Sequence, residues 1–492
     1  MEKTLQKTTI HGMLWSFMDT AGTQVIQLVV HLILARLLTP EDFGIVGMVT
    51  IFIALSSVFV DGGLTNGLIR EKESTQEDYS TIFYFNLSMA ILLYILLFAS
   101  AEYISIFFKQ PQLVNIIKVI GLILIINAFG LIQKTILTKN INFRTQMKIN
   151  VVSSILSGVI AIICALSGWG VWSLVVRTML MQFIQAFLLC ISNRWMPSLV
   201  FSISSFKRLF QFGWKLLLSN LISQLYGNLY SFIIGKSFSA STLGYYSNAV
   251  KFSDTAAYSL SVSVEKVSFP VLSSIQDDTA RLKRGYKKII KNAAYLSFPI
   301  MLGLAAIAEP LLRALLGEVW LPSIPYFQLL CISGMLIAIQ SINLSVLQVK
   351  GRSDLFLKLS LIRKVVGFIA IGVALLFQLG IMGLLWAMVV DSIISYFINA
   401  FYSKRFLGYS IPEQLKDLRP IFFIAVVMAA LTYSLSFFLP MNDLLIVLIQ
   451  VVFGISIYIF LSWVFKIEEL KTIYQILQPI QKRIFKKVIP SR

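Results

Sequence analysis

Long apolar stretches separated by short polar breaks run along the whole chain. A membrane-spanning helix needs about 20 mostly apolar residues. Fourteen stretches have this character: 12–36, 42–62, 81–104, 112–133, 149–168, 171–191, 209–234, 242–264, 292–316, 324–348, 357–378, 381–402, 420–439 and 443–465. Residues 423–437 are continuously apolar, whereas the strands of a membrane barrel alternate between apolar and polar positions. The pattern therefore predicts about fourteen transmembrane helices.

Composition supports the membrane prediction. Hydrophobic residues make up 57% of the 492 positions and charged residues 13%, about half the usual charged share of a soluble chain. The mean hydropathy of +0.81 leaves too little polar material to cover soluble domains. The net charge of +19 is not gathered into a recognisable nucleic-acid-binding module, so no nucleic acid partner is expected. The chain is predicted to be an all-α integral membrane protein.

The distribution of basic residues predicts the topology. With fourteen spans both termini lie on one side of the membrane, and Lys and Arg gather in cytoplasmic loops. On the side opposite the termini we find only Arg36, Lys109, Lys118, Lys236 and Arg313. Arg177, Lys215 and Lys251 lie within spans, and all other basic residues are on the side of the termini. Both termini are therefore predicted to be cytoplasmic.

An internal repeat is visible when residues 1–200 are laid over residues 201–400. At this constant offset Arg36 meets Lys236, Gln24 meets Gln224, and Phe43-Gly44 meets Leu243-Gly244. Several matches in one register predict two pseudo-symmetric six-helix bundles facing a central pathway. The predicted parts are an N-terminal lobe 1–200, a C-terminal lobe 201–405, two appended spans in 406–465 and a tail 466–492. The spacing of apolar residues in the tail predicts a basic amphipathic helix on anionic lipid, with partner binding as the alternative.

Polar side chains form a stripe along one face of the first predicted span and of the seventh. The first stripe comprises Ser16, Thr20, Thr23, Gln24, Gln27 and His31, and the second comprises Ser219, Asn220, Ser223, Gln224, Gly227, Asn228 and Ser231. Lipid cannot satisfy these groups, so each stripe must face another helix or water. Two readings follow, hydrogen bonding between helices or a water-filled cavity. Equivalent stripes in two repeats favour the cavity.

Charges inside spans cost roughly 2.5 to 3.5 kcal/mol each at the centre of a helix, which marks them as candidates for function. Lys251 and Asp254 share a face near the midplane, where a mutual ion pair and a substrate-facing role are both open. Lys215 could reach the surface along its own stem instead of contacting a ligand. Asp61, at the end of the second span, is interpreted as a helix-end residue.

The sequence contains no recognisable catalytic arrangement. We find no P-loop, no HExxH and no GxSxG, and the three cysteines lack metal-ligand spacing. A secondary transporter is therefore expected rather than an enzyme, with no metal and no cofactor, driven by the membrane potential, H⁺ or Na⁺. The predicted cavity residues are Lys215, Lys251, Arg36, Lys236, Gln24, Gln27, His31, Asn220, Gln224 and Asn228, with Asp19 and Asp254 as candidates for ion coupling.

Six segments carry a resemblance to a known family: 8-TTIHGMLWS, 34-LARLLTPEDFGIVGM, 61-DGGLTNGLIREKE, 243-LGYYSNA, 269-FPVLSSIQDDTARLKRGYKKII and 315-LLGEVWLPSIPYFQLLCISGM. They resemble the Wzx-type polysaccharide or O-antigen repeat-unit flippases, and most closely the colanic-acid and teichuronic-acid exporter group. These lipopolysaccharide biosynthesis proteins belong to the multidrug/oligosaccharidyl-lipid/polysaccharide (MOP) exporter superfamily. The resemblance implies a MATE/MOP-like fold and a multi-pass protein of the bacterial cytoplasmic (inner) membrane.

The resemblance also implies the substrate. Such a flippase moves undecaprenyl-diphosphate-linked oligosaccharide from the cytoplasmic to the outer leaflet by alternating access. The products are cell-surface polysaccharides such as lipopolysaccharide O-antigen, capsule or exopolysaccharide. The implied partners are this lipid, the bilayer, a polysaccharide polymerase and a chain-length regulator. A multidrug or cation antiporter of the same superfamily is the main alternative. A glycan polymerase or ligase usually carries a large outer loop, which this chain lacks.

Overall fold

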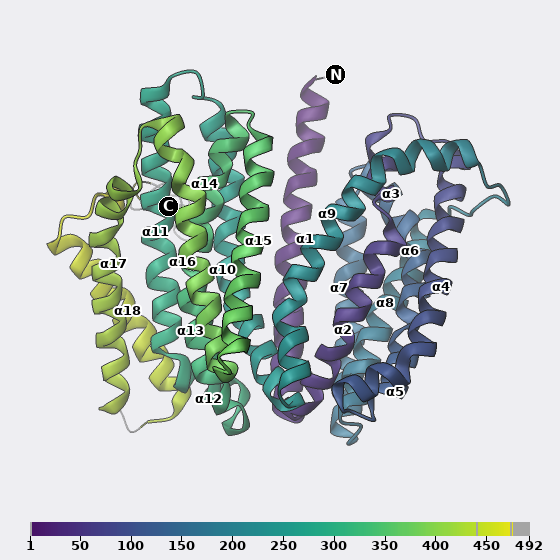
Figure 1. Ribbon diagram of the computed structural model, residues 1–492, viewed down its shortest axis with the longest axis horizontal. Coiled ribbons are helices and arrows are strands. Elements are labelled where there is room, and N and C mark those ends of the chain that lie inside the picture. Colours follow the sequence, from purple (N-terminus) through teal and green to yellow (C-terminus); the bar gives the residue numbers. More distant parts are fainter. Residues whose placement is uncertain (1, 439–440, 473–474, 476–492) are drawn as a thin grey trace, which may run out of the picture. The chain divides into compact units, whose positions relative to one another are not determined.

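The computed structural model describes residues 2–438, 441–472 and 475, in which every assigned element is a helix (Figure 1). By its contacts the chain divides into two compact units, residues 1–247 and 248–492. The division falls within helix α10 (Ala240–Ser273). The lobe boundary at residue 200 was predicted from the sequence repeat. It divides the chain by symmetry, whereas the two units divide it by compactness. That boundary stays a prediction.

Six long helices of the first unit follow one another around a bundle. α1 packs on α7, α7 on α8, α8 on α6, α6 on α4, and α4 on α2, whereas α1 and α2 do not pack along their lengths within the described residues. α9 lies across α2, α3 and α4 (Figure 1). The elements are α1 (Glu2–Leu37), α2 (Pro40–Asp61), α3 (Leu64–Arg70), α4 (Gln76–Phe108), α5 (Leu113–Ile120), α6 (Leu122–Lys139), α7 (Phe143–Leu166), α8 (Val171–Asn193) and α9 (Ile203–Ser237).

The second unit contains the rest of α10 and all later helices. In it α11 packs on α17, α16 packs on α13 and α15, and α17 packs on α18. The elements are α11 (Thr279–Ala306), α12 (Ala308–Leu316), η1 (Glu318–Ser323), α13 (Ile324–Gly334), α14 (Ile337–Val349), α15 (Ser353–Leu376), α16 (Gly380–Leu407), α17 (Ile411–Ser434), η2 (Leu435–Phe437) and α18 (Asp443–Val464).

Twelve candidate membrane spans are present within the described residues. They match the first six and the last six predicted spans. The seventh and eighth predicted spans lie in α9 and α10, which have 35 and 34 residues but are less apolar because of their polar positions. The count of fourteen and the cytoplasmic placement of both termini stay predictions. The predicted amphipathic helix of the tail lies mostly outside the described residues.

The turn after the first helix of each repeat keeps the offset of 200 residues. α1 ends at Leu37 and α9 at Ser237, and α2 and α10 begin three residues later in each case. Each second helix is capped in the same way, because the hydroxyl of Thr39 accepts from the Asp42 amide at 3.3 Å and that of Ser239 accepts from the Thr242 amide at 3.1 Å. The local hydrogen bonding therefore repeats along with the sequence.

The starts of α2 and α10 meet in a reciprocal contact. A Cβ placed on Gly44 would lie 1.8 Å from the carbonyl oxygen of Ala240, and a Cβ on Gly244 would lie 1.8 Å from that of Pro40. These four residues are paired by the same offset of 200. Only glycine allows the two backbones to approach this closely. The matched glycines of the sequence thus mark a contact between the two repeats, within the first unit.

Ion pairs join α11 to the last helices of the second unit. Lys287 lies 2.8 Å from Asp417, and Lys291 lies 2.7 Å from Glu469. The buried Tyr409, between α16 and α17, donates to the same Asp417 carboxylate at 2.7 Å. Burial and this neighbouring carboxylate raise the pKa of Tyr409 above its usual value. The appended helices are therefore held to the bundle by polar contacts as well as by apolar packing.

Candidate functional site

The predicted polar stripe of α1 lies on a partly open face. Gln24 is exposed, while Gln27 and His31 are half-buried, and the His31 ring meets Phe43 edge-on at a centroid distance of 5.3 Å. A Cβ placed on Gly22 would meet no atom within 4 Å. An amide exposed on a transmembrane helix has to face water rather than lipid. This part of α1 therefore borders an aqueous space.

The stripe of α9 has the same character. Asn220 and Gln224 are exposed, and Asn228 donates to the Gln224 backbone carbonyl at 2.9 Å and to its side-chain oxygen at 3.2 Å. A Cβ on Gly227 would again meet nothing within 4 Å. Within the described residues, the side chains of Gln24, Asn220 and Gln224 form no hydrogen bond to another helix. The geometry favours the water-filled cavity over hydrogen bonding between helices, although binding by these residues stays a prediction.

The carboxylate of Asp19 is enclosed by hydrogen bonds. The Asn150 amide donates to both carboxylate oxygens at 3.0 Å, and the Thr23 hydroxyl donates at 3.3 Å. Gln185 then donates to the side-chain oxygen of Asn150 at 2.6 Å. A polar chain therefore runs from α1 through α7 to α8. The sequence prediction included Asp19 but missed Asn150 and Gln185, whose only signal was an amide within a mostly apolar span.

The predicted cations of the first unit differ in their surroundings. Lys236 donates to the backbone carbonyl of Phe107 at 2.7 Å and lies 3.8 Å from the centroid of its ring. Lys215 is exposed, and its ammonium is 6.0 Å from the Trp214 ring. Lys236 is thus held by a hydrogen bond at the end of α9, whereas Lys215 is exposed. Arg36 is exposed at the end of α1.

Arg177, which lies within a predicted span, extends from α8 to α1. Its guanidinium donates to the backbone carbonyl of Gln27 at 3.3 Å. The half-buried guanidinium therefore places a positive charge against the backbone of α1. No helical periodicity pointed to this contact, because it depends on how α8 packs in the bundle.

Ten of the twelve predicted site residues belong to the first unit, and Lys251 and Asp254 belong to the second. Both side chains are exposed on α10, and the ammonium of Lys251 acts electrostatically on the Asp254 carboxyl. This agrees with charge coupling between them and leaves the substrate-facing role open. Within the described part of the chain, no group of three or more His, Cys, Asp or Glu residues is placed to hold a metal ion.

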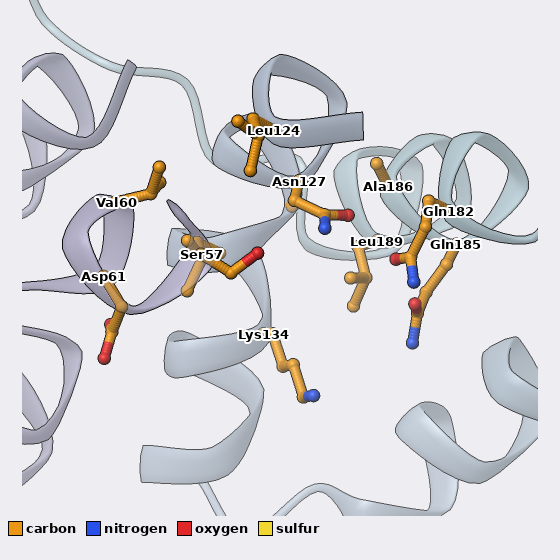
Figure 2. Close-up of a pocket in the computed structure, with 12 residues that line it drawn as sticks. Ser57, Val60, Asp61, Leu124, Asn127, Lys134, Gln182, Gln185, Ala186 and Leu189 are labelled. Atoms are coloured by element: carbon orange, nitrogen blue, oxygen red, sulfur yellow. The ribbon is translucent and has the colours of Figure 1, made fainter. Parts of the chain in front are cut away.

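A cavity of about 290 Å³ lies among α2, α6 and α8 (Figure 2). Its polar lining comprises Ser57, Asp61, Asn127, Lys134, Gln182 and Gln185, and its apolar lining comprises Val60, Leu124, Gly130, Leu131, Ala186 and Leu189. Gln185 also belongs to the polar chain that starts at Asp19. Asp61 is the last residue of α2, where its carboxylate accepts from the Thr65 hydroxyl at 2.5 Å, as a helix-end residue does. We call this cavity the amide recess.

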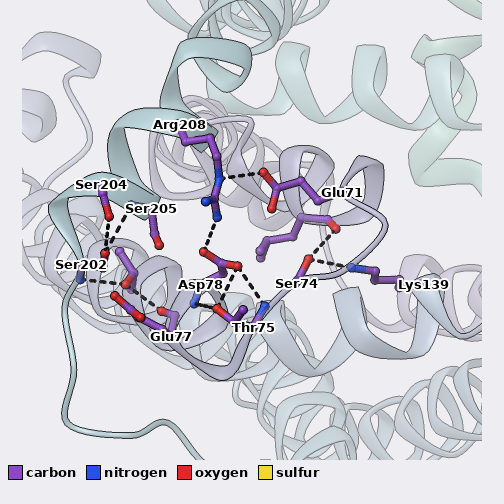
Figure 3. Close-up of polar contacts among 12 residues, drawn as sticks. Glu71, Ser74, Thr75, Glu77, Asp78, Lys139, Ser202, Ser204, Ser205 and Arg208 are labelled. Atoms are coloured by element: carbon purple, nitrogen blue, oxygen red, sulfur yellow. Dashed lines mark hydrogen bonds and ion pairs between the residues drawn. The ribbon is translucent and has the colours of Figure 1, made fainter.

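The start of α9 is anchored to the first unit by charge (Figure 3). Arg208 donates to Glu71 at 2.9 Å and to Asp78 at 2.5 Å. Asp78 also accepts from the backbone amide of Thr75 at 2.9 Å and so caps α4. One buried carboxylate therefore serves both the helix cap and the inter-helix ion pair. These contacts explain why α9, which begins the second repeat, belongs to the first compact unit.

A second cavity, of about 530 Å³, lies among α11, α17 and α18 in the second unit. Its lining is almost entirely apolar and includes Pro299, Ile300, Met428, Val451 and Ile455. Such a lining accepts a hydrocarbon chain and excludes a charged group. The two cavities thus differ sharply in the chemistry that each can accept.

Comparisons with known proteins agree with these features. The family described as "Polysaccharide biosynthesis protein" matches residues 33–325. The teichuronic acid biosynthesis protein TuaB of Bacillus subtilis is 27% identical, over 71% of this chain and 73% of its own length. The lipopolysaccharide biosynthesis protein WzxC of Escherichia coli is 25% identical, over 88% of each chain.

The fold is that of a solved membrane transporter. The lipid II flippase MurJ, in an inward closed conformation, superimposes with a TM-score of 0.74 at 18% identity, covering 92% of this chain and 98% of its own. The resemblance stated from the sequence is confirmed, as are the helical membrane fold and the location in the bacterial inner membrane.

Proposed function

Because the chain belongs to the polysaccharide biosynthesis protein family, we propose that it is a flippase for undecaprenyl-diphosphate-linked oligosaccharide repeat units. It carries these units from the cytoplasmic to the outer leaflet for cell-surface polysaccharide synthesis. One observation carries the proposal: exposed amides and open space lie along α1 and α9, in a chain that has twelve candidate membrane spans within its described residues. Hydrophilic cargo crossing a bilayer needs such a surface.

The substrate has three chemically different parts, and the chain offers a surface for each. Cations near the stripes, above all Lys215 and Arg177, suit a diphosphate. The exposed amides of Gln24, Asn220 and Gln224 suit sugar hydroxyls. The prenyl chain stays in contact with lipid, beside the apolar cavity of α11, α17 and α18.

Movement of the diphosphate is helped by the membrane potential. Each negative charge that leaves a negative interior gains about 2.3 kcal/mol per 100 mV. In this proposal the anion is bound in succession by Lys251, Lys215, Arg36 and Lys236, the last from its place beside Phe107 at the end of α9. Alternating access rocks the two repeats, with α9 and α10 as the seventh and eighth spans.

Ion coupling is assigned to the two carboxylates. Asp19 accepts three hydrogen bonds, two from the Asn150 amide and one from the Thr23 hydroxyl, and Asp254 is exposed beside Lys251. Each can exchange a proton or Na⁺ as the aqueous space changes sides. The protein acts without enzymatic chemistry and without a bound cofactor. It works beside a polymerase and a chain-length regulator that use its product.

The test follows lipid-linked repeat units in cells that lack the gene. We expect the units to accumulate on the cytoplasmic face and surface polysaccharide to disappear, with recovery on complementation. Lys215→Gln should lower recovery because an exposed cation near the stripe is lost, whereas Lys207→Gln, an exposed lysine earlier on α9, should not. A gene deletion that leaves outward movement intact and changes only drug or cation sensitivity would replace this function with that of an antiporter.

A further test concerns the four predicted cations together. Replacing Arg36, Lys215, Lys236 and Lys251 by Gln should abolish movement of the diphosphate-linked unit. Undiminished movement in a folded quadruple variant would refute successive anion binding while leaving the flippase function in place.

A further inference from the structure

The amide recess contains polar side chains without protein partners. The side chains of Asn127 and Gln182 form no hydrogen bond with the residues that the structure describes, and the Lys134 ammonium likewise has no bonded acceptor there. The amide nitrogen of Gln185 is used by Asn150, which leaves its oxygen available. Polar groups inside a helical bundle are costly unless they are bonded. Water or a ligand must satisfy them.

The lining defines the chemistry of that ligand. Amides both donate and accept, as sugar hydroxyls do, and Figure 2 shows the side chains of Asn127 and Gln182 reaching into the space from α6 and α8. Aliphatic carbons of Val60, Leu124 and Leu189 supply the apolar surface that the C–H face of a sugar ring packs against.

Other ligand classes fit the recess less well. A diphosphate would need several cations, but Lys134 stands there with the carboxylate of Asp61, so the formal charges cancel. A hydrocarbon chain would leave the three amides unbonded. The volume of about 290 Å³ equals the space of roughly ten waters at about 30 Å³ each, which suits one sugar ring rather than an oligosaccharide.

The recess also adjoins the polar face of α1. The six-helix bundle is not closed by packing between α1 and α2, and the chain Asp19–Asn150–Gln185 runs from the α1 stripe to the wall of the recess. A sugar could therefore enter sideways while the rest of the substrate stays beside α1 and α9.

We propose that the amide recess binds one uncharged sugar of the transported unit and thereby selects which repeat units are moved. This inference rests on the proposed flippase function. The amides of Asn127 and Gln182 bond the sugar hydroxyls, and Lys134 adds a charge-assisted hydrogen bond. The recess recognises the glycan, whereas the cations along the pathway recognise the diphosphate that every such lipid shares.

The test compares two lipids in proteoliposomes. One is the complete lipid-linked repeat unit from the cells that make it, and the other carries only the first sugar. Asn127→Leu and Gln182→Met remove an amide at nearly constant volume, so each should slow the complete unit about tenfold and leave the one-sugar lipid unchanged. Asn115→Leu, at an exposed site on α5 outside the recess, should change neither.

The outcomes separate the two proposals. If the wild type moves neither lipid, the flippase function fails. Suppose instead that the wild type moves both lipids. Folded variants that move them at the wild-type rate, or that slow both lipids equally, would refute selection by the recess and leave the flippase function in place.

A binding measurement tests the proposal even if the transport variants fail to fold. Ser57→Cys, which lies at the wall of the recess and leaves its amides in place, is labelled with a maleimide in a chain whose partly exposed Cys164 and Cys190 are replaced by Ser. Methyl glycosides of the repeat-unit sugars should slow the labelling at least threefold, and inorganic phosphate should not. Labelling that no glycoside slows would overturn sugar binding, and slowing by phosphate alone would make the recess an anion site.

Discussion

The contact between Gly44 and Gly244 allows a sharp test of the internal repeat. In Gly44→Ala, the new Cβ would lie 1.8 Å from the Ala240 oxygen, although carbon and carbonyl oxygen normally stay about 3.3 Å apart. The two helix starts would have to separate by about 1.5 Å. Overpacking of this kind typically costs about 1–3 kcal/mol. Gly244→Ala should cost a similar amount, because its Cβ meets the Pro40 oxygen at the same distance.

Matched controls lie on the polar stripes. A Cβ on Gly22 or Gly227 meets nothing within 4 Å, so Gly22→Ala and Gly227→Ala should be neutral or stabilise by up to about 1 kcal/mol through helix propensity. All four variants are purified in detergent, and their melting temperatures are compared. Surface polysaccharide in complemented cells reports on function. We expect a lower Tm and less polysaccharide only for the variants at the contact.

The double variant Gly44→Ala/Gly244→Ala distinguishes one shared contact from two separate defects. Once the first alanine has moved the helix starts apart, the second meets less resistance, so the combined loss should be well below the sum. Fully additive losses, or single variants that melt like the Gly22 and Gly227 controls, would refute the reciprocal contact.

Three further predictions concern polar groups away from the Gly44–Gly244 contact. Asp78→Asn should destabilise the fold by about 1.5–3 kcal/mol, because the buried carboxylate bonds Arg208 and caps α4. Glu71→Gln, which removes the more exposed partner of Arg208, should cost under about 1 kcal/mol in the same melting assay. The raised pKa of Tyr409 stabilises the fold below the unfolded value of about 10, so stability should fall above that pH, and less steeply in Tyr409→Phe; equal slopes in alkaline melts would contradict this. Asp19→Asn should lower Tm by removing an acceptor of the Asn150 amide, and Asn150→Asp added to it should restore part of the loss; no recovery would argue against the bond.

Prediction from sequence succeeded where the signal was local or periodic. Continuous apolar runs predicted the helices, because the length and hydrophobicity that a span needs can be read from a short window of sequence. The offset of 200 also predicted corresponding turns, and the structure places the caps of Thr39 and Ser239 in that register. The seventh and eighth spans had weaker signals, since the polar positions of α9 and α10 lower their hydropathy.

The site was partly visible from sequence. A stripe repeats every three or four residues on one helix, so Gln24 and Gln224 could be found without knowing their neighbours. Isolated amides such as Asn127 and Asn150 could not, and neither could the pair Gln182 and Gln185 on α8. Nothing in the helix that carries each amide shows what the amide faces.

By itself, then, the sequence determined that this chain is a helical membrane protein with a repeat and two polar helix faces. Tertiary structure alone decided that α9 joins the first unit through Arg208, that Asn150 links Asp19 to Gln185, and that amides from α6 and α8 converge on one recess. The physical reason is that periodicity and hydropathy belong to single helices. A cavity or an ion pair between helices depends on contacts between residues far apart in the chain, which only packing establishes.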